Sequence, residues 1–139
     1  MRRAAMFFTL VAVVAGAWFL VPSSKRAPEL ASGANPILPK GAMVAVIVPD
    51  AFSDQQKLGA RAYDVACAAC HGANGQGQDG VAPPLVHKIY EPSHHGDMAF
   101  LLAAQNGVRA HHWKFGNMPA VEGLTEADVL NIVAYMRAL

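Results

Sequence analysis

The longest hydrophobic pattern in the chain is an uninterrupted run near its start. Residues 4–21, AAMFFTLVAVVAGAWFLV, carry no charged side chain, and about 18 apolar residues are enough to cross a bilayer core as a helix. The small residues Ala15, Gly16 and Ala17 suit signal-peptide cleavage, but the apolar run continues beyond them. We therefore favour an uncleaved membrane anchor over a cleaved signal peptide. With either one, the chain after Pro22 is expected to be exported.

The next part of the chain predicts a tether. Residues 22–40 are rich in proline, serine, alanine and glycine and show no apolar periodicity. Residues 42–48, AMVAVIV, form a short apolar run closed by Pro49, which predicts an extended segment laid on the domain or on the membrane surface. The expected organisation is an anchor, a tether with the extended segment, and a folded domain, over residues 1–25, 26–52 and 53–139.

A helical pattern begins after this segment. Ser53 and Gln56 have the spacing of a capping box, which predicts a helix that starts there and runs into Cys67. The apolar positions at helical spacing in this stretch are Leu58, Ala62, Val65 and Ala66.

Two further helices are predicted. Residues 97–106, DMAFLLAAQN, form the first of them, ended by Gly107. Thr125 and Asp128 predict the start of the second. Its apolar positions are Val129, Ile132, Val133 and Met136. The loops between the helices are rich in glycine, proline and histidine and have almost no strand pattern, so we expect an all-α domain whose loops are ordered by something other than secondary structure.

The charge distribution narrows the choice of partners. The formal net charge is +1, but 7 basic and 10 acidic residues follow residue 26, which leaves that part at −3. A mildly acidic body without a lysine or arginine cluster lacks the electrostatic footprint of a nucleic-acid-binding protein. We expect no nucleic-acid partner.

The sequence CAACHG, residues 67–72, carries the most specific chemistry and contains the chain's only two cysteines. A structural zinc site needs four ligands, and no second thiol pair completes one. A redox dithiol usually begins a helix in a strand–helix context, whereas this motif ends a predicted helix. Covalent haem attachment fits better, because Cys67 and Cys70 are spaced for two vinyl groups and His71 is placed to bind the iron.

An electron-transfer haem needs a sixth iron ligand, and a methionine thioether raises its potential. Met118, in the loop sequence GNMPA, is our candidate because the following proline disfavours helix at this position. The remaining methionines lie in the apolar N-terminal segments or in predicted helices, where methionine usually fills core space: Met1, Met6, Met43, Met98 and Met136.

From about Ser53 onwards the chain resembles a small monohaem cytochrome c of the His/Met-ligated class I type. The motifs match in order: a capped helix, CAACH, APPL after a glycine-rich loop, a middle helix, NMP and a last helix with an aromatic residue. The resemblance implies an all-α fold of three to four helices around one covalent haem, here preceded by a single transmembrane helix. It also implies that the first and last helices cross, with Gly59, Tyr63 and Tyr135 at the contact.

The resemblance assigns roles to further residues. The carbonyl of Pro83 would accept the Nδ1–H of His71, and Leu85 would pack on the haem face. Trp113 would donate its indole N–H to a haem propionate, with ordinary core packing as an equal alternative. The expected haem-binding residues are Cys67, Cys70, His71, Pro83, Leu85, Trp113 and Met118.

With His71 and Met118 filling the iron's axial positions, the resemblance implies an electron carrier rather than an enzyme. The expected partners are redox proteins or membrane complexes, such as a quinol-oxidising complex, a terminal oxidase or a reductase, with no small-molecule substrate. The expected location is the periplasmic side of a bacterial inner membrane, with a soluble periplasmic form as the alternative. Two other functions stay open: a fixed haem subunit of a larger membrane oxidoreductase, and a haem enzyme or gas-binding protein with an open sixth position.

Two histidine pairs raise the question of a second metal. His94 and His95 lie in one loop, and His111 and His112 lie in another. Because adjacent side chains diverge, each pair is expected to supply one ligand at most. We favour solvated loop histidines over a second metal site.

Overall fold

The computed structural model describes residues 38–139, so the expected anchor at residues 4–21 lies outside the described part. The described residues form α-helices and two short 3₁₀ helices, with no strands beyond isolated residue pairs. In chain order these helices are α1 Asp54–Ala66, α2 Ala68–His71, η1 Ala73–Gly75, η2 Lys88–Tyr90, α3 Asp97–Asn106 and α4 Glu126–Met136. The all-α prediction is confirmed for these residues, none of whose helices is long and apolar enough to cross a membrane.

Both predicted capping boxes are present, and they explain where α1 and α4 start. The Ser53 backbone N–H donates to Gln56 Oε1 at 2.8 Å, and the Gln56 N–H donates to Ser53 Oγ at 3.2 Å. At α4, Thr125 and Asp128 make the same reciprocal pair, at 3.0 and 3.2 Å. Each box satisfies backbone donors that a helix start leaves without an intrahelical partner.

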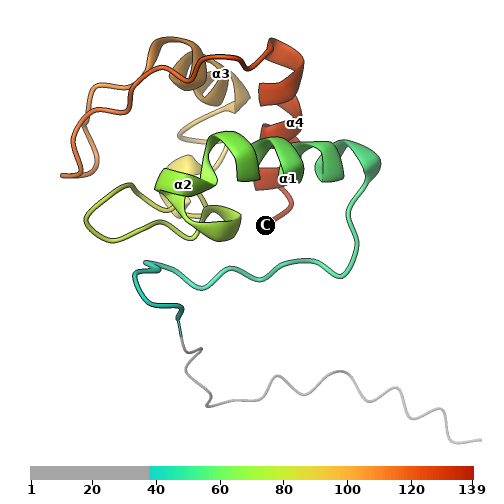
Figure 1. The fold of residues 1–139 in the computed structure, drawn as a ribbon, viewed down its shortest axis with the longest axis horizontal. Helices are drawn as coiled ribbons and strands as arrows, with labels where there is room; N and C mark the ends of the chain where they lie inside the picture. Colours follow the sequence, from blue (N-terminus) through green and yellow to red (C-terminus); the bar gives the residue numbers. More distant parts are fainter. Residues whose placement is uncertain (1–37) are drawn as a thin grey trace, which may run out of the picture. The chain divides into compact units, whose positions relative to one another are not determined.

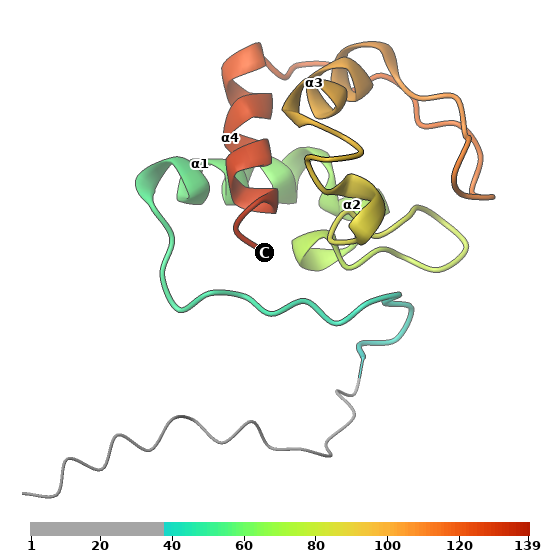
Figure 2. The ribbon, with the colours of Figure 1, turned by 180° about the vertical axis from the view of Figure 1, so that it is seen from behind.

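The core is built where α4 lies across α1, as Figures 1 and 2 show from opposite sides. Gly59 makes this crossing possible, since a Cβ atom at this position would lie 1.9 Å from the Asn131 carbonyl oxygen. Tyr63 is completely buried beside the crossing, and its ring centroid lies 5.8 Å from that of Tyr135. The three residues implied by the cytochrome c resemblance therefore lie at or beside the helix contact.

The predicted apolar positions of α1 are wrong in part. Leu58 is 49% exposed and Val65 is 88% exposed, whereas the buried residues of α1 are Gly59 and Tyr63. The reason is that Gly59 and Tyr63, four residues apart, form the helix face that meets α4. Leu58 and Val65, seven residues apart, share another face that points to solvent.

Helix α3 packs on α4. The chain that follows α3 runs back toward α2, where it lines the same cavity as His71. Leu101 and Ala104 are buried together with Val129 and Val133. The predicted end of α3 at Gly107 is confirmed, with φ +73° at that glycine. A Cβ there would lie 2.5 Å from the Met118 carbonyl oxygen, so only glycine lets the two chain segments approach this closely.

The predicted extended segment lies on the domain. Residues 42–48 contain no regular secondary structure, and the backbone N–H groups of Met43 and Val44 both donate to the Gln76 carbonyl oxygen at 3.1 Å. Further along, the Gly77 N–H donates to the His71 carbonyl oxygen at 2.8 Å. These bonds hold the loop that follows α2 close to the motif residues.

Candidate functional site

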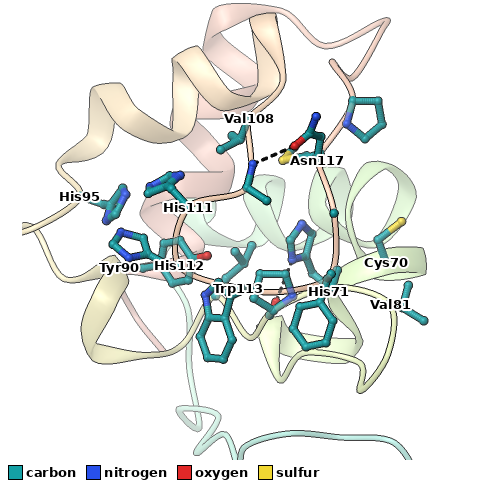
Figure 3. Close-up of a pocket in the computed structure, with 18 residues that line it drawn as sticks. Cys70, His71, Val81, Tyr90, His95, Val108, His111, His112, Trp113 and Asn117 are labelled. Carbon is teal, nitrogen blue, oxygen red and sulfur yellow. Dashed lines mark hydrogen bonds between the residues drawn. The ribbon is translucent and has the colours of Figure 1, made fainter.

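His71 ends α2 and lies in the wall of a cavity (Figure 3). The side chain is only 8% exposed, and its Nδ1–H donates to the Pro83 carbonyl oxygen at 2.9 Å. Burial lowers the pKa of His71, and the hydrogen bond to Pro83 opposes this with a smaller effect. The ring is therefore a neutral imidazole whose Nε2 keeps a free lone pair, as an iron ligand requires.

Cys67 lies at the break between α1 and α2, and Cys70 lies within α2, directly before His71. Cys67 has φ −121° and ψ −34°, which ends α1 and starts α2. The thiol of Cys67 is half-buried, whereas Cys70 is exposed at the cavity. Burial, with a smaller effect of Cys70, raises the pKa of Cys67 to about 11. Redox and nucleophilic thiols depend on a lowered pKa, so Cys67 does not have the character of a redox thiol.

The segment after α3 forms the other side of the cavity. Val108 and Met118 exchange backbone hydrogen bonds of 2.9 and 3.0 Å, and the Ala110 N–H donates to Asn117 Oδ1 at 2.9 Å. These bonds fold the segment into a loop whose Met118 lines the same cavity as His71. The other methionines of the described chain do not line it: Met43, Met98 and Met136.

The cavity has a mostly apolar lining. Leu85 lies between the cavity and the core around Tyr63. Trp113 stacks on Phe115, with ring centroids 6.0 Å apart. The Trp113 Nε1 atom is buried and has no hydrogen-bond partner within residues 38–139. A buried indole N–H normally has an acceptor, so it is suited to a polar group of a bound molecule.

Sequence reasoning missed several residues of this cavity. Tyr90, His95, His111 and His112 also line it. The sequence signal was the pair of adjacent histidines in each long loop, but spacing alone could not show that the two loops meet. Reduced hydration, followed by the charges of the neighbouring histidines, lowers the pKa of His112.

These residues fit a porphyrin with an iron centre. The cavity combines the thiol of Cys70, an oriented imidazole, a thioether, apolar walls and an unpartnered indole N–H, and Cys67 lies one helical turn before Cys70. The thiols can bind the vinyl groups, and the imidazole and thioether are ligands that haem iron accepts. The fold and this site together define a helical protein that carries a covalently attached haem.

The comparison with known families agrees with this class. Residues 56–139 match the family model described as cytochrome c. The match covers more than half of the chain, and the chain therefore belongs to the cytochrome c family. Members bind haem covalently, and Cys67 and Cys70 fit the attachment motif. No curated protein shows significant similarity to the chain.

Proposed function

We propose that this cytochrome c is a one-electron carrier in which His71 and Met118 occupy both axial positions of a single haem iron. The observation that supports this most strongly is that His71 and Met118, from distant parts of the sequence, line one apolar cavity. A haem with both positions filled has no site for a substrate, which favours outer-sphere electron transfer.

The residues around the cavity have separate tasks in this proposal. When bound, the haem supplies reversible one-electron chemistry at its iron. Pro83 fixes the ring of His71 and increases its basicity through the hydrogen bond to Nδ1–H. Leu85 excludes water from the haem face, and the Nε1–H of Trp113 is free to donate to a propionate.

The exposed edge of the cavity is the proposed route for electrons. Cys70 is exposed, and Val81, which also lines the cavity, is 43% exposed. A haem attached through Cys70 would present its edge here to a docked protein. The small contact areas of redox encounters suit such a surface.

The proposed partners are membrane redox complexes, namely a quinol-oxidising complex on one side and a terminal oxidase or a reductase on the other. The proposed location is the periplasmic side of the inner membrane, with residues 4–21 as the anchor. Tethering confines the search for partners to the membrane surface. This part of the proposal rests on the apolar N-terminal run and on the needs of covalent haem attachment.

The sixth ligand can be tested with the matched substitutions Met118→Ala and Met98→Ala in the haem-loaded protein. Met98 is 58% exposed on α3 and is a methionine outside the cavity, which makes it the control. We expect the reduced wild-type protein and the Met98 variant to resist carbon monoxide. The Met118 variant should bind it and should have a reduction potential lower by about 0.1 V or more, within the roughly 0.8 V range that axial ligands span. Tight carbon monoxide binding by the wild-type protein would instead support an enzyme or gas-binding protein.

A fixed haem subunit of a larger membrane oxidoreductase is the second candidate. In this function the exposed Leu58 and Val65, which share one face of α1, would lie against the partner subunit. Extraction in mild detergent followed by sizing separates the two functions. A single 14.7 kDa chain with its haem supports the mobile carrier, and a large stable assembly supports the subunit.

A further inference from the structure

Three imidazole rings converge beside the haem cavity. His94, His95 and His112 each offer a ring nitrogen, and the three nitrogens lie within 4.8 Å of one another. Figure 3 shows the rings of His95 and His112 facing the same region near Tyr90. The expectation that adjacent side chains diverge is wrong for His94 and His95, since both rings have a nitrogen in the cluster and their centroids lie 4.7 Å apart.

The separation of two of these nitrogens suits a shared metal ion. His94 Nε2 and His112 Nε2 lie 3.2 Å apart. Two imidazole nitrogens bound to one tetrahedral zinc ion at about 2.0–2.1 Å are roughly 3.3 Å apart. The rings thus need little movement to place a cation between them. Without a cation, one of the two nitrogens must carry a proton for the pair to attract each other.

The third ring has the hydrogen bond that orients metal-bound histidines. His95 Nδ1–H donates to the Ile89 carbonyl oxygen at 2.7 Å, which leaves the lone pair on Nε2. A ligating histidine usually donates its other ring N–H to a carbonyl or carboxylate in this way. His71 is held by the same arrangement with Pro83.

The backbone that carries His94 and His95 is held by Arg137, the residue that follows α4. The guanidinium of Arg137 donates to the carbonyl oxygens of Tyr90 and His95, the latter at 2.7 Å, and pairs with Asp97 at 3.0 Å. His112 lies in the other loop, which the Val108–Met118 pairing described above holds in place. Two separately anchored loops therefore bring the three rings together.

We propose that His94, His95 and His112 form a second, non-haem metal site that binds one borderline divalent cation, Cu²⁺ more tightly than Zn²⁺. Three neutral imidazoles are the donor set that copper and zinc accept, whereas magnesium and calcium prefer oxygen. The preference for copper follows from the general order of affinities among divalent first-row metals. A fourth position stays open to water, because His94 and His112 are exposed.

The site is distinct from the haem iron but adjoins its cavity. His95 and His112 belong to both the cluster and the cavity lining. His111, next to His112, turns its Nδ1–H to the Arg109 carbonyl oxygen at 2.9 Å and is not one of the three clustered residues. His111 is therefore a matched control, with the same chemistry and the same loop.

The test uses the full-length, untagged, haem-loaded protein. Zn²⁺ is titrated by calorimetry, and Cu²⁺ is titrated by electron paramagnetic resonance, which detects nitrogen coupled to the copper. We expect one ion per chain, nitrogen coupling in the copper spectrum and no Mg²⁺ binding. His112→Gln and His94→Gln should weaken binding at least about 100-fold, whereas His111→Gln should change it less than about threefold. Haem absorption and circular dichroism report whether each variant is folded.

A measurement on the wild-type protein avoids dependence on the variants. Zn²⁺ is diamagnetic and does not broaden NMR signals, so its binding can be followed by them. It should shift the imidazole signals of His94, His95 and His112 and leave that of His87 in place. The proposal is overturned if no ion is retained, if copper shows no nitrogen coupling, or if His111→Gln weakens binding as much as His112→Gln.

Discussion

Replacing Gly59 with alanine should destabilise the protein sharply, although alanine is the better helix former. The added Cβ would lie 1.9 Å from the Asn131 carbonyl oxygen and 2.4 Å from the Asn131 carbonyl carbon. Ordinary contact begins at 3.4 Å, so α1 and α4 would have to separate by about 1.5 Å. A backbone carbonyl inside a helix cannot rotate away from the new methyl group.

The size of the effect follows from two opposing contributions. Overpacking costs about 1–3 kcal/mol, and forced separation around the completely buried Tyr63 should place Gly59→Ala at or above the upper end of that range. The higher helix propensity of alanine offsets this loss by about 1 kcal/mol. The net loss should be about 2 kcal/mol or more, which lowers the Tm by roughly 10 °C for a domain of this size.

The assay is denaturant unfolding of the haem-loaded protein followed by far-ultraviolet circular dichroism, with Gly96→Ala as the control. Gly96 has φ −65°, and an added Cβ there would meet only the Pro92 carbonyl oxygen, at 3.9 Å. This control should lose no more than about 1 kcal/mol of stability. Any loss would come from the N-cap position of α3, where alanine is less favourable than glycine. A Gly59 variant as stable as the wild-type protein would refute the reasoning about the helix crossing.

Three further predictions concern polar side chains. Tyr135→Phe removes the 2.7 Å hydrogen bond to Asn74 Oδ1 and should cost about 1 kcal/mol in the same unfolding assay; an unchanged midpoint would contradict it. Burial raises the pKa of Tyr63 and, less strongly, those of Tyr90 and Tyr135. Above about pH 10 the folded protein therefore keeps phenolic protons that the unfolded chain releases. Stability should therefore be level below about pH 10 and fall above it, with a shallower fall in Tyr63→Phe, as measured by unfolding at a series of pH values. Arg137→Gln should cost about 1.5–3 kcal/mol by breaking hydrogen bonds from a charged donor to two carbonyls, whereas a loss under 0.5 kcal/mol would show that the loop needs no such anchor.

The sequence predicted the features that depend on local chemistry. The capping pairs at Ser53 and Thr125 and the glycine end of α3 act through neighbours within a few residues, so their spacing was sufficient. The attachment motif was recognisable for the same reason, since Cys67, Cys70 and His71 lie within five consecutive residues.

The features that were missed depend on contacts between distant parts of the chain. Leu58 and Val65 have helical spacing, yet the buried face of α1 was decided by how closely Gly59 could approach α4. Likewise, no spacing rule could place His94 beside His112, because Arg137 and the loop pairings bring their segments together. In both cases contacts between distant segments determined the structure: the face of α1 that is buried, and the loops that lie side by side.

The most direct test of the central claim is a pyridine haemochrome spectrum combined with the intact mass of the denatured chain. The protein is produced in cells that attach haem to cysteine pairs, and a variant with Cys67→Ala and Cys70→Ala is the control. We predict a c-type spectrum and a mass increase of one haem per chain that survives denaturation in the wild-type protein and is lost in the variant. A wild-type chain at its polypeptide mass, with extractable haem or none, would contradict the account.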